Sequence, residues 1–336
     1  MFIVVEGTDA SGKSSLIDAL NTEIAANWAV NDNFIQFHKG RPIEETRRWV
    51  LNDYVNSIEN INWCSKIGLS DRWHWGEVTY APLKRPHTNK DGYGLLGKAG
   101  WRWTELFMMS RGIAQFWLYQ PLEIISERLT RRGDDYINVD ELETILHQYE
   151  FAAQNSCIIE KLQPDPHNID AVPDLARHII KRAVDVHNSV VVTSKYKKYI
   201  GSPKPTTLLV GDTRNITARY GEETQLPFMP VDGNSGDYLL NALPENFWKR
   251  VGIVNANDIN EDIYDLWIEL GRPNIVALGR LAARGLERNG IGNDLFRTLP
   301  HPQYVRRFHN KDQIEYGEAI QRHGTNTNTE DKWILR

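Results

Sequence analysis

The chain has 336 residues, of which 41% are hydrophobic and 25% are charged, and its formal net charge is −5. This length allows about two domains, and the acidic balance argues against indiscriminate nucleic-acid binding but not against a local basic groove. No run approaches the ~20 apolar residues of a membrane span, no basic-then-apolar leader opens the chain, and the two cysteines, Cys64 and Cys157, form no disulfide framework or zinc cluster. We therefore expect a cytoplasmic protein without a membrane partner.

The first half of the chain alternates short apolar runs with helical patterns, which is typical of an α/β fold with a parallel sheet. The expected strands are 2–5, 34–38, 66–70 and 115–119, and the expected helices are 44–58, 123–131, 139–159 and 172–187. Residues 84–100 are rich in Gly and Lys and have no clear period, so they are interpreted as a long loop.

Residues 7–14, GTDASGKS, fit the phosphate-binding P-loop pattern G-x-x-x-x-G-K-[ST]. A predicted strand precedes this loop and a helical pattern follows it, which is the context that the motif needs. The loop amides and the helix N-terminus would hold ATP phosphates, while Lys13 would reach the β- and γ-phosphates and Ser14 would ligate Mg²⁺. The predicted ATP-binding residues are Gly7, Ala10, Ser11, Gly12, Lys13, Ser14 and Ser15.

Two carboxylates accompany the loop. A carboxylate facing phosphate would be repelled, so Asp9 makes sense if it orients or deprotonates an acceptor hydroxyl; the alternative is a solvent-facing loop residue. Asp71 and Arg72 directly follow the strand at 66–70, at the edge of the sheet where ligands bind. Asp71 would hold Mg²⁺ and Arg72 would pair with a phosphate, unless the two form a structural ion pair.

Arginines mark the end of the predicted helix at 123–131. Arg128 and Arg132 lie four residues apart, so they share a helical face, and they precede the sequence Gly133-Asp134-Asp135. Positively charged side chains beside the oxygens of the transferring phosphoryl group promote phosphoryl transfer. The cluster is interpreted as a closing lid with an arginine finger, or else as a solvated helix end.

The second half begins after 195–205, a basic segment with Gly, Ser and two prolines that indicates a domain boundary. Apolar runs at 207–210, 251–255 and 274–278 predict three more strands, and a helix is expected after Gly279. The predicted organisation is therefore a kinase-type domain over 1–195 and a second α/β domain over 206–325.

The first half resembles the thymidylate kinase family of P-loop nucleotide kinases. The similar motifs are EGTDASGKS at 6–14, DRWHW at 71–75 and PLEIISERLTRRGD at 121–134. The resemblance implies ATP and Mg²⁺ on the donor side and a thymine-type deoxynucleotide as acceptor, with Asp9 near the acceptor. It also implies that Trp73 and Trp75 wall the base pocket and that Arg47 meets the acceptor phosphate. The loop at 84–100 has no counterpart in compact family members.

The last third resembles the uracil-DNA glycosylase-like superfamily. The similar segments, in chain order, are 209–215, 226–228, 235–240, 254–255, 275–279 and 299–302. The resemblance implies that Phe228 stacks on a flipped base, that Asn255 reads a pyrimidine edge and that His301 lies in a loop near DNA. Phe228 as a core residue and Asn255 as a turn residue are the alternatives. The expected catalytic loop lacks a convincing water-activating residue, so we expect a domain that holds a base without cleaving it.

Three functions remain open: a free-nucleotide kinase, a kinase that acts on a base in DNA, and a glycosylase with an accessory ATPase domain. A base in duplex DNA must leave the stack before chemistry reaches it, so the second function uses both halves of the chain. The chain also resembles the phage kinases that phosphorylate 5-hydroxymethyluracil in DNA, which would act in the host cytoplasm. DNA is therefore an expected partner of the second domain, and homodimerisation stays open.

Overall fold

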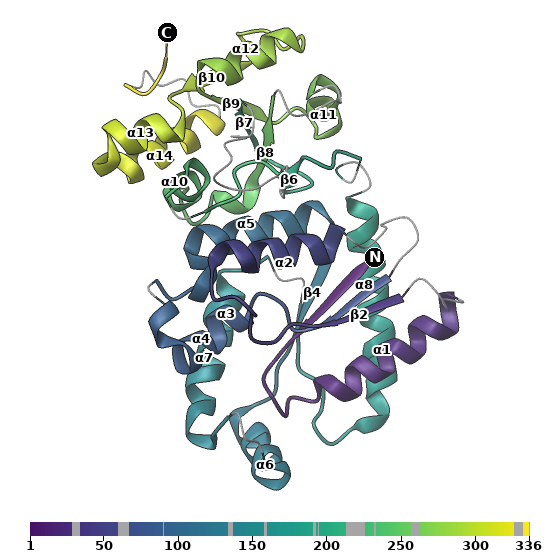
Figure 1. Cartoon of the computed structure of the whole chain (residues 1–336). Coiled ribbons are helices and arrows are strands. Elements are labelled where there is room, and N and C mark those ends of the chain that lie inside the picture. The colour runs from purple at the N-terminus through teal and green to yellow at the C-terminus, as the bar shows by residue number, and fades with distance from the viewer. Residues whose placement is uncertain are drawn as a thin grey trace. The chain divides into compact units, whose positions relative to one another are not determined.

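The computed structural model describes residues 1–28, 34–59, 67–89, 91–133, 137–157, 160–190, 193, 195–212, 226–231, 233–256, 263–325 and 332–335. The chain divides into two compact units (Figure 1). The first unit comprises Met1–Gly97 and Gly112–Asn188, and the second comprises Lys98–Arg111 and Ser189–Arg336. A segment within the first half of the sequence therefore packs with the second half.

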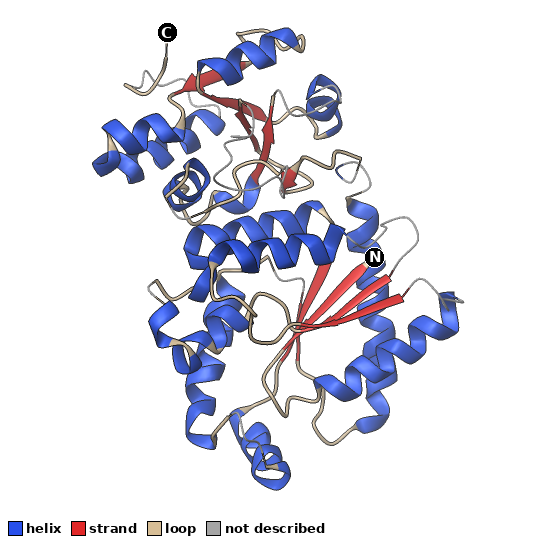
Figure 2. Ribbon diagram, viewed as in Figure 1, coloured by secondary structure: helices blue, strands red, loops and turns tan. Residues whose placement is uncertain are grey.

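The first unit is built on a parallel sheet in the order β2-β3-β1-β4-β5. Its strands are β1 (Phe2–Glu6), β2 (Phe34–His38), β3 (Ile67–Asp71), β4 (Ile113–Leu118) and β5 (Glu160–Leu162). Its helices are α1 (Lys13–Trp28), α2 (Arg47–Glu59), α3 (Gly76–Thr79), α4 (Ala81–Lys84), α6 (Leu122–Arg132), α7 (Leu142–Gln154) and α8 (Val172–Ser189). The expected α/β fold with a parallel sheet flanked by helices is confirmed (Figure 2), while the glycosylase-like type of the second domain stays a prediction.

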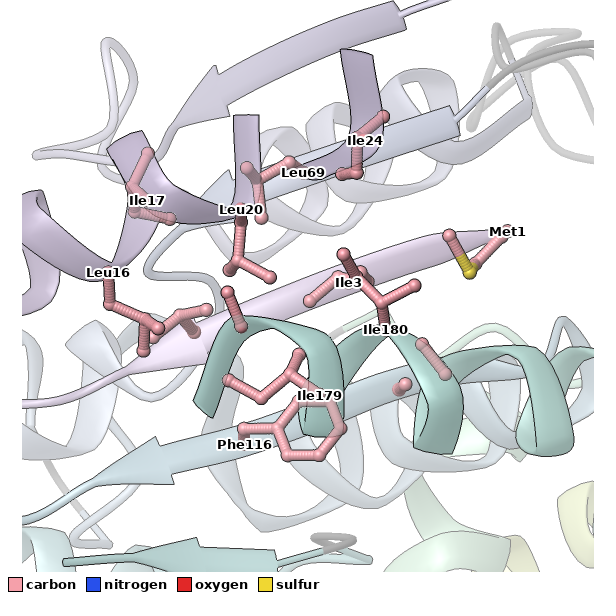
Figure 3. Close-up of a cluster of buried hydrophobic side chains, with 14 of the residues drawn as sticks. Met1, Ile3, Leu16, Ile17, Leu20, Ile24, Leu69, Phe116, Ile179 and Ile180 are labelled. Carbon is pink, nitrogen blue, oxygen red and sulfur yellow. The ribbon is translucent and has the colours of Figure 1, made fainter. Parts of the chain in front are cut away.

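The two faces of this sheet differ in composition. Helices α1 and α8 pack on one face through aliphatic side chains such as Leu20 and Ile179, which meet Ile3 and Phe116 (Figure 3). The other face is aromatic: the Trp73 ring lies 5.3 Å from that of Phe2, and the rings form part of a wider buried group. Because both faces of the sheet are buried, the strands appear in the amino-acid sequence as continuous hydrophobic runs.

The prediction of a long loop over residues 84–100 is wrong for most of that segment. Its described residues form the end of α4, two 3₁₀ turns at Pro86–Thr88 and Gly94–Leu96, and the start of α5 (Gly97–Ser110). The second turn is fastened to its surroundings, because Glu77 accepts a hydrogen bond from the Leu95 amide at 3.0 Å. Glu77 also forms a buried ion pair with Arg85 at 2.8 Å.

The second unit is a second α/β sheet in the order β10-β9-β7-β8-β6. Its pairs are parallel except β6 with β8. The strands are β6 (Ile200–Gly201), β7 (Thr207–Gly211), β8 (Val251–Asn255), β9 (Asn274–Leu278) and β10 (Phe296–Leu299). The helices besides α5 are α10 (Ser235–Ala242), α11 (Ile263–Glu269), α12 (Arg280–Arg288), α13 (Pro302–Phe308) and α14 (Gln313–Gly324).

Helix α5 is anchored in this second unit by a buried arginine. Arg102 donates to the carbonyl oxygens of Leu240 and Leu243 at 2.6 and 2.7 Å, and so caps the C-terminal end of α10. It also pairs with Glu245 at 2.7 Å. Helix C-termini leave carbonyl oxygens without partners, so this arginine explains why α5 belongs to the second unit. No helix within the described ranges combines the length and apolar composition needed to cross a bilayer.

Candidate functional site

The loop between β1 and α1 has the curled backbone that a phosphate-binding loop requires. Gly7, Ala10 and Gly12 have φ values of 155°, 60° and 97°, in a region that side chains disfavour. A Cβ at Gly7 would lie 2.6 Å from the carbonyl oxygen of Leu118. Ser14 and Ser15 are exposed on the first turn of α1, where the helix dipole favours an anion.

Lys13 is folded back onto this loop. Its side chain donates to the carbonyl oxygens of Gly7 and Thr8 at 2.8 and 2.7 Å and is buried. Burial, followed by the nearby charge of Arg72, lowers the pKa of Lys13 to about 7. The lysine is thus held where phosphate oxygens would replace carbonyl oxygens as its partners.

Asp9 lies in a compact polar cluster with Arg72 and Tyr80. Its Oδ1 accepts from the Arg72 guanidinium at 2.5 Å, and its Oδ2 accepts from the Tyr80 hydroxyl at 3.1 Å. Burial opposes ionisation, but the charges of Arg72 and Lys13 prevail and lower the pKa of Asp9. The side chain is 22% exposed. Asp9 is therefore an ionised carboxylate that an entering hydroxyl group could still approach.

Asp71, predicted to hold Mg²⁺ together with Ser14, is partly buried at the end of β3. One carboxylate oxygen of Asp71 lies 3.4 Å from His38 Nδ1, and within the described residues the other is buried without a hydrogen-bond partner. The described part of the chain contains no group of three or more His, Cys, Asp or Glu arranged for a metal. Mg²⁺ at phosphate sites usually keeps several waters and takes one or two protein ligands, so the magnesium role of Asp71 and Ser14 stays a prediction.

Of the predicted lid arginines, Arg128 reaches the loop. It donates to the Ala10 carbonyl at 3.3 Å and to the Pro166 carbonyl at 2.8 Å. Arg132 is exposed at the last position of α6. Asp134 and Asp135, predicted as part of the lid, lie outside the described residues.

The residues predicted to form the acceptor pocket have other contacts. Trp73 and Trp75 are 1% and 0% exposed and pack among the aromatic side chains of the sheet face. Arg47 donates to the Leu95 carbonyl at 3.4 Å. Their acceptor-binding roles stay predictions. The described contacts show that the two tryptophans pack in the core and that Arg47 holds the segment around Leu95.

Sequence reasoning missed two buried residues beside the loop. Glu6 accepts hydrogen bonds from the amides of Trp73 and Trp75 at 2.9 and 3.4 Å. Tyr149, on α7, donates its hydroxyl to the Gly7 carbonyl at 2.7 Å. Glu6 is the first residue of the EGTDASGKS motif, but no role was assigned to it, and no motif marks Tyr149.

A second cluster lies in the second unit, where β7 and β8 end. Gly211 and Asn255 are neighbours in register, and a Cβ at Gly211 would meet Asn255 Oδ1 at 2.3 Å and the Phe228 ring at 2.6 Å. The Phe228 ring lies 6.2 Å from the His301 ring. The structure therefore brings together Phe228, Asn255 and His301, which are far apart in the sequence.

The turn that carries Phe228 is held in a strained conformation. Phe228 has φ 48°, which costs on the order of 1–3 kcal/mol for a non-glycine residue. Trp103 of α5 donates to the Pro227 carbonyl at 3.1 Å, and Asn234 donates to the Met229 carbonyl at 2.8 Å. Strain that several contacts maintain is common at binding sites.

The His301 side chain is the N-cap of helix α13. Burial lowers its pKa, against the opposing charge of Asp212. Its Nδ1 accepts from the Gln303 amide at 3.2 Å, which leaves the proton on Nε2. The predicted segment at 213–215 lies outside the described residues.

Helix α13, which follows His301, presents aromatic and basic side chains. Tyr304 and Phe308 are 50% and 68% exposed, with ring centroids 4.9 Å apart. Arg307 and Lys311 are exposed beside them. Exposed aromatic rings among basic side chains are the features that single-stranded nucleic acids bind.

Comparisons with known proteins give distant likenesses. No protein-family model and no curated protein matches the chain. YorR from Bacillus subtilis, solved with phosphorylated GDP, is 20% identical over 56% of this chain and 98% of its own, with a TM-score of 0.41. Deoxyadenosine kinase from M. mycoides with bound dATP is 15% identical over 54% of this chain and 100% of its own, with a TM-score of 0.35. Similarity this distant decides neither fold nor activity, which rest on the chain's own geometry.

Proposed function

We propose that the first unit transfers the γ-phosphoryl group of ATP to a hydroxyl group of a thymine-type pyrimidine deoxynucleotide. The observation that carries the proposal is the cluster of Asp9, Arg72 and Tyr80 beside the phosphate loop. A carboxylate at this place would repel phosphate unless it serves the acceptor. The cluster therefore favours a kinase over an enzyme that only hydrolyses ATP.

In the proposed reaction, the loop amides and Lys13 hold the β- and γ-phosphates. The acceptor oxygen forms a bond to the γ-phosphorus while the bond to the β–γ bridging oxygen breaks, and ADP leaves. The hydroxyl proton is lost late in the step and passes through Asp9 to solvent. Asp9 accepts a hydrogen bond from the hydroxyl and orients it, while Arg72 and Arg128 stabilise the charge on the phosphoryl oxygens. Ser14 and Asp71 would hold Mg²⁺, which neutralises charge on the phosphates.

Asp9 serves better as an orienting group than as a strong base. Its pKa is lowered, and both of its oxygens already accept hydrogen bonds. The loose transition state of phosphoryl transfer asks for positioning and charge stabilisation more than for full deprotonation. An ionised, partly exposed carboxylate meets this requirement.

We further propose that the favoured acceptor is 5-hydroxymethyluracil within DNA. The cluster of Phe228, Asn255 and His301 supports this, because a flipped pyrimidine needs an aromatic face and polar groups for its edge. The aromatic and basic surface of α13 supports DNA as the partner. A free-nucleotide kinase would have no evident use for either feature.

The test is incubation with γ-labelled ATP and, in parallel, dTMP, plain DNA and DNA that contains 5-hydroxymethyluracil. We expect label in the modified DNA, and we expect Phe228→Ala to reduce it at least tenfold. Leu281→Ala, at a 56% exposed position of the same unit, is the matched control and should keep wild-type labelling. Label in dTMP alone would contradict the DNA acceptor, and abasic sites without label would favour a glycosylase.

A further inference from the structure

We propose that Glu6 is a positioning residue that fixes Arg72 against Asp9 by binding the backbone of the turn that follows Arg72. Glu6 ends β1 directly before the phosphate loop, and its side chain is fully buried. This inference rests on the proposed function for its catalytic consequence, but not for its structural claim.

Arg72 needs such support because its backbone is strained. Its φ of 67° is a left-handed value that non-glycine residues rarely adopt. On one side the Arg72 amide donates to the Val5 carbonyl at 2.9 Å, and the Arg72 carbonyl accepts from Ser70 Oγ at 2.7 Å. These contacts hold Arg72 itself and leave the following residues to be fixed separately.

Glu6 supplies the missing support on the other side. Its Oε1 accepts from the Trp73 amide at 2.9 Å and from the Trp75 amide at 3.4 Å. Trp73 and Trp75 are 1% and 0% exposed, so water cannot replace this acceptor. A buried amide without a hydrogen-bond partner is unfavourable, so without Glu6 the turn would relax until these amides found other partners.

Relaxation of this turn would move the Arg72 guanidinium. That group lies 2.5 Å from Asp9 Oδ1 and 3.2 Å from the Tyr80 hydroxyl, so all three polar groups depend on the turn. Displacing a catalytic group by about 1 Å can lower the rate of an enzyme about 100-fold. Glu6 touches none of the reacting atoms in this scheme and acts only through Arg72.

Burying the Glu6 carboxylate is unfavourable if its only purpose is to accept these hydrogen bonds. Burial raises the pKa of Glu6 to about 7, against the opposing charge of His74, and within the described residues its Oε2 has no hydrogen-bond partner. Glu6→Gln keeps an acceptor oxygen in place, whereas Glu6→Met fills a similar volume without one. The pair of variants therefore separates the hydrogen bonds from the packing.

The closing experiment measures phenylglyoxal modification of Arg72 by peptide mass spectrometry, with no acceptor present. Glu6→Met should speed modification of Arg72 at least tenfold, and Glu6→Gln should stay within threefold of wild type. Arg41, whose side chain is 68% exposed, is the internal reference and should react equally in all three proteins. Binding of a fluorescent ATP analogue confirms that each variant is folded, and Glu6→Asp replaces Glu6→Met if the latter is not.

Steady-state kinetics of the same variants measure how the Glu6 substitutions affect catalysis. In Glu6→Met, kcat should fall about 100-fold with little change in the KM for ATP, and Glu6→Gln should restore most of it. Wild-type protection of Arg72 in Glu6→Met would overturn the inference, as would equal deprotection in Glu6→Gln. If no acceptor is phosphorylated but the Arg72 result holds, the proposed function fails and the positioning role stands.

Discussion

Lys13 should take up a proton when a nucleoside triphosphate binds. In the free protein, burial and Arg72 lower the pKa of Lys13 to about 7, so above that pH the amine is largely neutral and rests on two carbonyl oxygens. A bound triphosphate places several negative charges beside it and favours the charged form. The binding reaction therefore couples to protonation, and its pH dependence reports the state of this lysine.

The size of the effect follows from the pKa. At pH 8 a group with a pKa of about 7 is roughly one-tenth protonated, so complete charging takes up ~0.9 proton per nucleotide bound. At pH 6 the group is already about nine-tenths protonated, and uptake falls to ~0.1 proton. The uptake should thus decrease several-fold between pH 8 and pH 6.

Isothermal titration calorimetry in buffers of different ionisation enthalpy measures this proton count directly. The matched control is Lys13→Met, which keeps an unbranched side chain without a titratable group and should eliminate the pH-dependent uptake. Proton uptake near zero at pH 8, or uptake that persists in Lys13→Met, would show that Lys13 is not the group that gains the proton.

Four further predictions concern single residues. Gly7→Ala should abolish binding of a fluorescent ATP analogue, because its Cβ would lie 2.6 Å from a backbone oxygen; wild-type affinity would contradict this. Asp9→Asn should lower kcat about 100-fold in steady-state assays, because the acceptor hydroxyl loses its orienting carboxylate, with a small change in the KM for ATP. An unchanged kcat would remove Asp9 from the mechanism. The pKa of Glu6 is raised from 4.5 to about 7, so between these pH values the folded chain holds a proton that the unfolded chain releases, and wild type loses stability as pH rises through that window. Urea unfolding at pH 5 and pH 8 should show Glu6→Gln gaining about 2.5 kcal/mol relative to wild type at the higher pH, and parallel pH profiles would count against this. Arg102→Met should reduce the free energy of unfolding by roughly 2–5 kcal/mol, because buried carbonyl oxygens lose their donors. The control Lys98→Met removes a more exposed partner of the same Glu245 and should reduce the free energy of unfolding by less than about 1 kcal/mol. Equal losses would refute the capping role of Arg102.

The strands and the phosphate loop could be predicted because their signals are local. Apolar runs such as 2–5 and 251–255 became β1 and β8, and the GTDASGKS pattern became a loop with the expected backbone. Fully buried parallel strands leave continuous apolar runs in a sequence. Glycines at positive φ likewise mark the places where the chain must curl.

The remaining features depend on contacts between distant residues. Nothing in the sequence around Arg102 shows that it caps α10, 138 residues away from it at Leu240. A run of glycines and lysines suggested a loop at 84–100, but Glu77 and Asn89 fasten that segment through its backbone amides. The DRWHW motif suggested that Trp73 stacks on a base, but in the structure its ring packs on Phe2. Tertiary packing decided each case.

The central claim is that the phosphate loop delivers the γ-phosphoryl group to an acceptor hydroxyl rather than to water. The most direct measurement follows the label of γ-labelled ATP under single-turnover conditions, with a mixture of deoxynucleotides and modified DNA, in wild type and in Lys13→Ala. We expect wild type to move the label to an acceptor and Lys13→Ala to move none. Label that appears only as inorganic phosphate, or transfer that survives in Lys13→Ala, would contradict it.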